Sequence, residues 1–194
     1  MKHALLDKLP TIALAGNPNV GKSTLFNALT GLRQHTGNWP GKTVETAEGI
    51  CKKGGRSLRL VDLPGMYSLD PHSPEEAAAM EYLRSGAAEA VVVVCDATCL
   101  LRNLPLVFQI LSVTGRVIVC LNLMDEAERK GIRIDLEALS RLLGVEVVGV
   151  TARKKRSLPP LLSAMERCLA CPEEEQPGEF LFPEENLNLW VKRI

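Results

Sequence analysis

Hydrophobic and polar positions follow two patterns that alternate along this chain. Short apolar runs at 11–16, 90–96, 116–122 and 145–150 predict buried strands, because the strands of a parallel sheet are covered on both faces. Segments with apolar residues at helical spacing lie between or after these runs: 22–30, 74–85, 100–113, 126–143 with an interruption at Gly131, and 157–169. Strands that alternate with helices are typical of a mainly parallel sheet covered on both sides.

One hairpin departs from this alternation. Residues 44–51 and 57–61 predict two strands, and KKGGR between them predicts the turn. We therefore expect an α/β fold with a mostly parallel six-stranded sheet, one antiparallel edge strand and helices on both faces. The polar, glycine- and proline-rich segments 31–43 and 62–74 predict long loops.

Composition limits the classes of protein to consider. The 194 residues suit one domain with a tail, and we expect a folded domain at 1–171 and a linker or tail at 172–194, which could also be the start of a further helical domain. The formal net charge is zero, so charge gives no general reason to expect a nucleic acid or a membrane surface as partner. No apolar run approaches the length of a membrane helix. The six cysteines are expected to be reduced and structural, with a metal pair at Cys168 and Cys171 as the alternative.

A phosphate-binding motif occupies the turn between the first predicted strand and helix. Residues 16–23 read GNPNVGKS and fit the pattern G-x-x-x-x-G-K-[ST]. Such a turn points main-chain N–H groups inward, and the helix N-terminus adds partial positive charge, so a phosphate is favoured there. We expect Lys22 to reach the β- and γ-phosphates and the Ser23 hydroxyl to bind Mg²⁺. The alternative is a glycine-rich turn that binds nothing.

A second motif indicates that the base is guanine. Residues 122–125, NLMD, stand at the end of a buried strand, at the edge where open α/β sheets bind ligands. The Asp125 carboxylate can accept hydrogen bonds from N1–H and the exocyclic amine of guanine, a pair of donors that adenine lacks. Thr151 and Ala152 would back the base through main-chain N–H groups. Alternatively, Asp125 caps the next helix and Asn122 merely ends the strand.

Two loops carry residues suited to sensing a third phosphate. In DLPG, residues 62–65, the Asp62 carboxylate can hold Mg²⁺ through water, and the N–H of Gly65 can meet the γ-phosphate. Thr43 in the earlier loop would complete the Mg²⁺ shell, although a simple turn hydroxyl is the alternative. We expect switch segments at about 31–44 and 64–74, ordered by triphosphate and released on hydrolysis.

The chain resembles the GTPase domain of the ferrous iron transport protein B family. The resemblance covers roughly residues 10–165 and rests on GNPNVGKSTLFNALTG, TGNWPGKTVE, DLPGMYSLDPHSPEE, DATCLLRNLPLVFQI, NLMDEAERKGI and ID…LSRLLGVEVV. Nucleotide motifs occur in many GTPases, whereas GNWPGKTVE and YSLDPHSPEE are more particular to this family. The resemblance implies a Ras-like P-loop GTPase fold.

The same resemblance implies a function and a setting. It implies a domain that binds and hydrolyses GTP with Mg²⁺ and regulates a bacterial Fe²⁺ permease at the cytoplasmic face of the inner membrane. The expected partners are the membrane permease region of the family and small accessory proteins of the same uptake system. No nucleic acid is expected, and this chain alone is expected to be soluble.

The family also resembles potassium-activated GTPases. In those, the second asparagine of the P-loop, here Asn19, helps to hold K⁺ beside the phosphates. The family lacks the water-orienting glutamine after the DxPG motif, and Met66 stands there in this chain. We therefore expect slow, K⁺-stimulated hydrolysis. The alternative for Asn19 is a turn residue that tolerates unusual backbone angles.

The expected site residues follow from these motifs and from the resemblance. The catalytic groups are Lys22, Asn19, Thr43 and Gly65. The metal ligands are Ser23, Thr43 and Asp62 for Mg²⁺, and Asn19 for K⁺. The residues expected to contact GTP are Gly16, Asn17, Pro18, Asn19, Val20, Gly21, Lys22, Ser23, Thr24, Gly41, Lys42, Thr43, Asp62, Leu63, Pro64, Gly65, Asn122, Leu123, Met124, Asp125, Val150, Thr151 and Ala152.

Two other functions are open at this point. One is a binding module whose nucleotide state gates a partner while hydrolysis is negligible, and Met66 keeps that alternative in play. The other is a GTPase associated with RNA or the ribosome, since such proteins also use GNPNVGKS-type loops. The zero net charge and the lack of an RNA-binding segment in these residues argue against the second.

Overall fold

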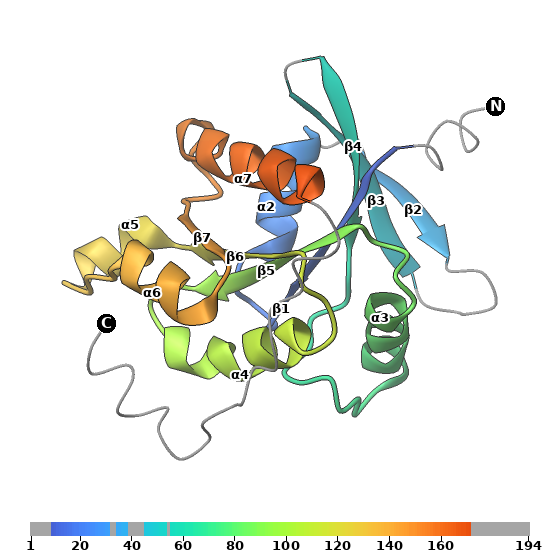
Figure 1. The fold of residues 1–194 in the computed structure, drawn as a ribbon, viewed down its shortest axis with the longest axis horizontal. Helices are drawn as coiled ribbons and strands as arrows, with labels where there is room; N and C mark the ends of the chain where they lie inside the picture. Colours follow the sequence, from blue (N-terminus) through green and yellow to red (C-terminus); the bar gives the residue numbers. More distant parts are fainter. Residues whose placement is uncertain (1–8, 32–33, 39–44, 54, 172–194) are drawn as a thin grey trace.

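A mixed β-sheet with helices on both faces organises the protein (Figure 1). The computed structural model describes residues 9–31, 34–38, 45–53 and 55–171, with the backbone alone at 34–38, 45, 46 and 53. The expected tail at 172–194 lies outside the described residues. The elements are β1 (Thr11–Gly16), α2 (Lys22–Thr30), β2 (Gln34–Asn38), β3 (Glu45–Lys53), β4 (Arg56–Asp62), α3 (Pro74–Arg84), β5 (Ala90–Asp96), α4 (Leu100–Leu111), β6 (Val117–Asn122), α5 (Met124–Arg129), α6 (Leu136–Leu143), β7 (Glu146–Gly149), the 3₁₀ turn η1 (Lys155–Ser157) and α7 (Pro159–Ala170).

The sheet contains the six predicted strands and one more. Among the described residues the strand order is β2-β3-β4-β1-β5-β6-β7. The strands β4, β1, β5, β6 and β7 are parallel, and β3 runs antiparallel to β4. The predicted α/β class and the hairpin at 52–56 are therefore confirmed.

The prediction that 31–43 is entirely loop was wrong. Residues Gln34–Asn38 form β2, which pairs antiparallel with β3 and takes the edge position that had been expected for β3. The segment reads QHTGN and has no apolar alternation. Its main-chain hydrogen bonds to β3 define it as a strand, and pairing of that kind leaves no hydrophobic signal in the sequence.

Side chains that alternate along the strands build one apolar core on each face of the sheet. From β1, Ile12 and Leu14 join a cluster with residues of α2 and α7 such as Phe26 and Met165. The residues between them in β1 face the other cluster, which is completed by α3, α4 and α6. Figure 1 shows α2 and α7 on one side of the sheet and α3 and α4 on the other.

Local signals explain where several helices begin and end. Ser73 caps α3 by accepting a hydrogen bond from the N–H of Glu76 at 3.1 Å, and Pro74 occupies the first turn. Gly131, with φ of 71°, separates α5 from α6, as the sequence predicted. In the described part of the chain, no helix has the length and hydropathy needed to cross a bilayer.

The parallel strands end at one edge of the sheet, and the predicted motifs follow them there. The phosphate-binding turn follows β1, Asp62 ends β4, and Asn122 ends β6. Since β1 lies between β4 and β5, this edge contains the switch point at which α/β sheets bind ligands.

Candidate nucleotide-binding site

A cavity of about 660 Å³ lies where the loops after β1, β4, β6 and β7 meet. This volume is in the range of sites for small organic ligands. The cavity is lined by Asn17, Pro18, Asn19, Gly21, Lys22, Ser23, Thr24, Gly65, Asn122, Leu123, Asp125, Glu126, Arg129, Thr151, Ala152 and Arg153. The motifs predicted to bind phosphate and guanine, about 100 residues apart in the sequence, thus share one cavity.

Glycine is required at two positions of the phosphate-binding turn. Gly16 has φ of 156°, and a Cβ there would lie 2.5 Å from the carbonyl oxygen of Val94. Gly21 has φ of 83°, and a Cβ would lie 2.4 Å from Nδ2 of Asn122. A side chain at Gly16 would therefore collide with strand β5, and one at Gly21 would collide with Asn122.

Asn19 adopts the left-handed backbone conformation, with φ of 67°. Asparagine is among the few residues other than glycine that reach this conformation readily, which explains an asparagine at this point of the turn. The conformation fits the interpretation of Asn19 as a turn residue. Asn19 is also exposed and lines the cavity, which leaves its side chain accessible to a ligand.

The phosphate end of the cavity contains a compact polar cluster. The ammonium of Lys22 donates hydrogen bonds to Oδ1 of Asp62 and to the carbonyl oxygen of Leu63. The hydroxyl of Ser23 donates to the other carboxylate oxygen of Asp62 at 3.1 Å. Lys22 is 9% exposed and Asp62 is 10% exposed, so this ion pair is largely removed from water.

The residues predicted for Mg²⁺ suit that ion. Ser23 contributes a hydroxyl oxygen and Asp62 contributes carboxylate oxygens, and the two side chains are in direct contact. Oxygen ligands of this kind, together with phosphate oxygens, are what Mg²⁺ prefers. Thr43, the third predicted ligand, lies outside the described residues, as do Gly41 and Lys42.

The second predicted switch begins in contact with the phosphate-binding turn. A Cβ at Gly65 would lie 3.2 Å from Cα of Pro18, and the N–H of Met66 donates to the carbonyl oxygen of Gly16 at 3.1 Å. The side chain of Met66 is fully buried in the core that includes α3 and α4. It therefore does not face the cavity.

Asn122 connects the two ends of the cavity. Its Nδ2 donates to the carbonyl oxygen of Val20 at 2.9 Å, and its Oδ1 accepts from the N–H of Ala152 at 3.0 Å. The side chain is 1% exposed. Asn122 therefore does more than end the strand, because its side chain joins the phosphate-binding turn to the loop after β7.

Asp125 does not cap α5. Leu123 occupies the N-cap position in the left-handed conformation, with no capping hydrogen bond from a side chain. Asp125 instead lies in the first turn and lines the cavity. Its carboxylate Oδ2 is 3.0 Å from Nζ of Lys154. The hydrogen bond from Lys154, with smaller contributions that include a hydrogen bond from Thr151, lowers the pKa of Asp125.

Most of the predicted contact residues in the described part of the chain line the cavity. Those that do not are Gly16, Val20, Asp62, Leu63, Pro64, Met124 and Val150. The side chains of Val20, Leu63 and Val150 are buried in the core, so only their main-chain atoms are available to a ligand.

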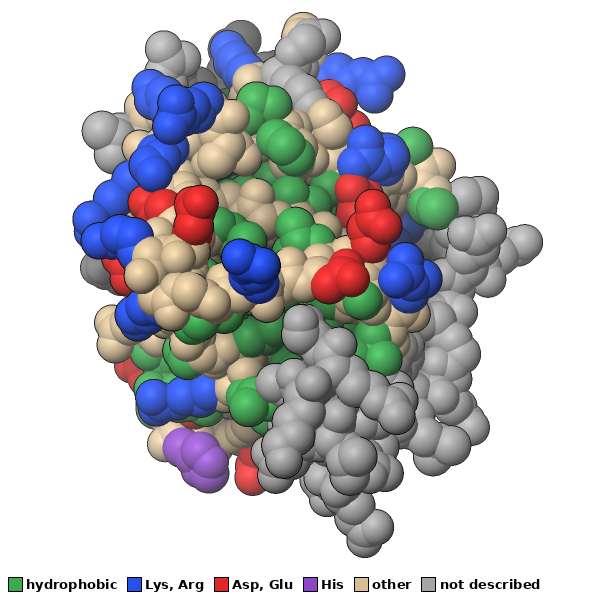
Figure 2. All heavy atoms as spheres, turned by 90° about the vertical axis from the view of Figure 1, so that its left-hand side faces the viewer, with side chains coloured by type: hydrophobic (Ala, Val, Ile, Leu, Met, Phe, Trp, Pro, Cys, Tyr) green, Lys and Arg blue, Asp and Glu red, His purple; other side chains and the backbone are tan. Residues whose placement is uncertain are grey.

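Three residues that sequence reasoning did not include also line the cavity: Glu126, Arg129 and Arg153. A signal for them existed, since Arg153 directly follows VTA, while Glu126 and Arg129 lie in the helix that begins at NLMD. The face that carries α5 and α6 shows basic and acidic side chains interspersed (Figure 2). Charge on this face is thus mixed and does not present one broad basic field of the kind that nucleic acids bind.

Comparisons with known proteins agree with this geometry. The family described as "Ferrous iron transport protein B" matches residues 10–165. The Fe(2+) transporter FeoB of Salmonella typhimurium is 46% identical over 161 residues, which cover 81% of this chain and 21% of that protein. The chain thus spans about a fifth of the length of the curated relatives it matches.

Solved structures of FeoB proteins share the fold. The G domain of the T. maritima FeoB iron transporter has a TM-score of 0.77 and 39% identity, over 82% of this chain and 98% of that one. The cytosolic domain of the same transporter in its GMPPNP form has a TM-score of 0.82 and 39% identity, over 85% of this chain and 66% of that one. These matches confirm the predicted P-loop GTPase fold.

Proposed function

This chain belongs to the ferrous iron transport protein B family, and we propose that it binds GTP, hydrolyses it to GDP and phosphate, and thereby regulates Fe²⁺ uptake. One observation carries the proposal: a single cavity is lined both by the phosphate-binding turn and by Asp125, whose carboxylate would accept hydrogen bonds from guanine. Asn122 bonds to Val20 in the phosphate-binding turn and to Ala152 in the loop after β7, and so links the two ends of the cavity. A ligand that fills this cavity must carry phosphate at one end and a hydrogen-bonding base at the other.

Nucleotide binding requires an exchange of partners at Lys22. Its ammonium is paired with Asp62 and must transfer to the phosphate oxygens. The exchange keeps the largely buried positive charge paired before and after binding, which avoids the large cost of an isolated buried ion. It also frees the oxygens of Ser23 and Asp62. Mg²⁺, when bound there, neutralises charge on the phosphates and so favours cleavage of the γ-phosphoryl bond.

Hydrolysis in this site proceeds without a side chain at position 66 to orient water. The Met66 side chain is buried in the core and does not reach an attacking water; main-chain groups of the two switches would position that water, and the N–H of Gly65 would meet the γ-phosphate. Thr43 would be a further Mg²⁺ ligand, and Asn19 would help to hold a K⁺ ion, which would supply transition-state charge as an arginine finger does in other GTPases. Turnover is accordingly slow and stimulated by K⁺.

The link to iron comes from the relatives. The relatives are described as Fe(2+) transporters, and this chain matches only 21% of the length of the Salmonella typhimurium protein. The rest of such a protein is a membrane permease for Fe²⁺, and the switches of this chain control it. The chain therefore acts at the cytoplasmic face of the membrane, and small accessory proteins of the uptake system are further partners.

Calorimetry with GDP, GTP and ATP in magnesium buffer tests the binding. GDP and GTP should bind, and ATP should bind at least about 100-fold more weakly, because Asp125 offers no donor to adenine and loses both of its acceptor contacts. Equal affinity for ATP, or no affinity for GDP, would overturn the proposal.

Phosphate release measured in KCl and in NaCl at equal ionic strength tests the hydrolysis. We expect faster turnover in KCl, and equal rates would reject the role given to K⁺. The buried side chain of Met66 favours one rival function, a nucleotide-gated binding module. No turnover in either salt, with GTP binding retained, would establish that rival.

A further inference from the structure

The carboxylate that faces the base site already has a cationic partner. Nζ of Lys154 is 3.0 Å from Oδ2 of Asp125, and the two side chains are 46% and 30% exposed. Lys154 belongs to the loop between β7 and α7, whereas Asp125 belongs to α5. The pair therefore joins two of the segments that surround the base end of the cavity.

The loop that carries Lys154 is held by its own hydrogen bonds. The N–H of Lys154 donates to the carbonyl oxygen of Thr151 at 2.7 Å. The hydroxyl of Ser157 accepts from the N–H of Thr151 at 3.0 Å and lies 2.8 Å from the carbonyl oxygens of both Thr151 and Lys154. The backbone that carries the Lys154 ammonium is thus a hydrogen-bonded turn.

The same turn is tied to the rest of the site. The N–H of Ala152 donates to Oδ1 of Asn122 at 3.0 Å, and Asn122 in turn bonds to Val20 in the phosphate-binding turn. The turn that positions Lys154 beside Asp125 is therefore connected by hydrogen bonds, through Asn122, to the phosphate-binding turn.

We propose that Lys154 is a positioning residue for guanine recognition, which holds the Asp125 carboxylate at the base site before the nucleotide arrives. This role rests on the proposed binding of GTP. A carboxylate has about four lone-pair sites, so a hydrogen bond to Lys154 leaves acceptors for N1–H and for the exocyclic amine of guanine. Arg129, which lines this end, does not replace it, since its guanidinium donates to the main-chain oxygen of Asp125 and pairs with Glu126.

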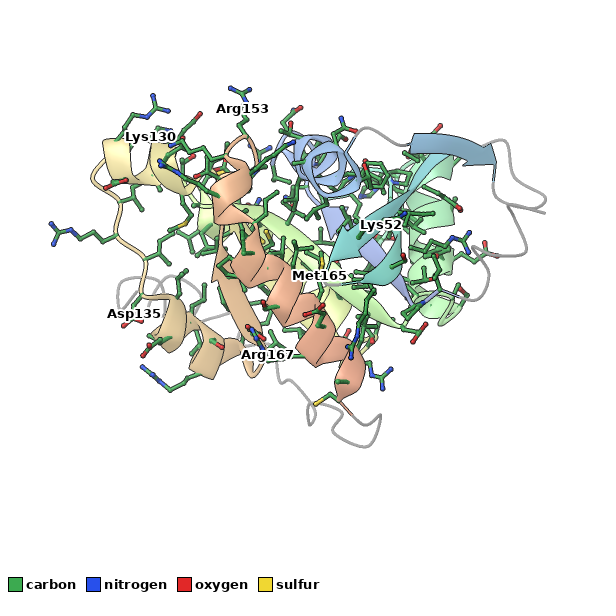
Figure 3. The ribbon with its side chains drawn as sticks, turned by 90° about the horizontal axis from the view of Figure 1, so that it is seen from above. Lys52, Lys130, Asp135, Arg153, Met165 and Arg167 are labelled. Carbon is green, nitrogen blue, oxygen red and sulfur yellow. The ribbon has the colours of Figure 1, made fainter. Side chains whose placement is uncertain are left out.

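Lys155 provides a matched control. It is the next residue, is also an exposed lysine, and carries the same charge on the same turn. Its side chain lines a separate groove with Lys52, Leu158 and Leu162, not the nucleotide cavity. Figure 3 shows Arg153 of this turn at the outer edge of the molecule that also bears Lys130, and Lys52 away from both, on the hairpin strand β3. Comparing Lys154→Met with Lys155→Met separates the contact with Asp125 from a general loss of charge.

The test compares GDP with inosine diphosphate, whose base keeps N1–H but lacks the exocyclic amine. Lys154→Met should weaken GDP binding by about two- to fivefold, the range of a solvent-exposed ion pair, and weaken binding of inosine diphosphate less. The ratio of the two affinities should therefore fall. Lys154→Arg should restore the ratio, and Lys155→Met should leave it at the wild-type value. A purely structural effect would weaken both ligands equally.

Two results would overturn the proposal. One is the same affinity ratio in Lys154→Met and in wild type. The other is tighter GDP binding by Lys154→Met, which would make Lys154 a competitor of the base for Asp125. If the wild-type chain bound no GDP, the proposed function itself would fall and this role with it, whereas wild-type binding with an unchanged ratio would reject the role of Lys154 alone.

Discussion

The two ends of the nucleotide cavity each hold a lysine–aspartate pair, but the pairs differ in burial and in what a nucleotide does to them. At the phosphate end, Lys22 and Asp62 are 9% and 10% exposed. At the base end, Lys154 and Asp125 are 46% and 30% exposed and 3.0 Å apart. The first pair lies within a dense cluster, while the second is open to water.

The difference in burial matches a difference in role. In the proposed function, the phosphates bind the ammonium of Lys22 and displace the Asp62 carboxylate from it. In the same proposal, guanine binds the carboxylate of Asp125, and Lys154 can keep its hydrogen bond to that carboxylate. A largely buried pair must be exchanged for an equally good one, whereas an exposed pair adjusts at little cost.

The largest effect is expected from Lys22→Ala. The substitution removes the cation that faces the phosphates, and hydrogen bonds to charged groups are worth about 1.5–3 kcal/mol each, so affinity for GDP should fall by more than about 100-fold. Lys52→Ala, an exposed lysine on β3 outside the cavity, is the control and should bind as wild type does. Titration calorimetry measures both, and circular dichroism checks that each variant is folded. A loss of GDP affinity of less than tenfold would mean that Lys22 is not the main contact of the phosphates.

Asp125→Asn should reverse the preference for the base. An amide offers an acceptor oxygen and a donor NH₂ group, so the contact with the exocyclic amine of guanine is broken while a contact to the carbonyl oxygen of xanthine is gained. We expect GDP affinity to fall by about 30-fold or more, since the hydrogen bond from the exocyclic amine to a charged acceptor is lost and N1–H keeps only a neutral acceptor, and xanthosine diphosphate to become the preferred ligand. Competition between the two diphosphates on the variant measures the change. If GDP stayed preferred, Asp125 would not be the residue that reads the base.

Asn122→Ala should uncouple the two ends. The side chain is 1% exposed and makes hydrogen bonds of 2.9 and 3.0 Å to Val20 and Ala152. Loss of both leaves a buried carbonyl and a buried N–H unpaired, so the free energy of unfolding should fall by about 2–4 kcal/mol. Urea unfolding without nucleotide measures it. A stable variant with unchanged GDP affinity would show that the ends do not depend on this link.

Much of the fold could be predicted because parallel strands buried on both faces give uninterrupted apolar runs, as in AVVVVC of β5. The strand β2 could not, since QHTGN has no such run and is defined by its hydrogen bonds to β3. A strand of that kind is stabilised by its neighbour's main chain rather than by its own side chains.

The site was predictable where a motif fixes chemistry, and not where two segments of chain meet. Glycine at 16 and 21 and the lysine at 22 follow from the phosphate-binding motif. The pairing of Lys22 with Asp62, and of Lys154 with Asp125, joins residues from different motifs. Charge in the sequence indicates what each residue offers to a ligand, but only the folded arrangement indicates which partner it has before the ligand arrives.

The smallest effect concerns the titration of Asp125. The hydrogen bond from Lys154, together with its charge and a hydrogen bond from Thr151, holds the pKa of this carboxyl below its ordinary value, which is about 4. The charged form is thus favoured in the folded protein, and acceptor capacity for guanine is lost only as pH falls through the lowered pKa. Lys154→Met should raise the pKa, because Lys154 is the dominant cause of the shift.

Carbon-13 NMR of the aspartate side-chain carboxyls, recorded without nucleotide between about pH 2.5 and 6 to span the ordinary value, measures that shift directly. Glu126, Arg129 and Arg153 also lie at this end of the cavity and are unchanged in both variants. Lys155→Met should titrate as wild type does, while Lys154→Met should titrate at higher pH and lose GDP at a correspondingly higher pH on acidification. Coincident curves for wild type and Lys154→Met would mean that the exposed pair exerts no force on Asp125. Of the two pairs, only Lys22 and Asp62 would then position a side chain before the nucleotide binds, because this pair is largely shielded from water.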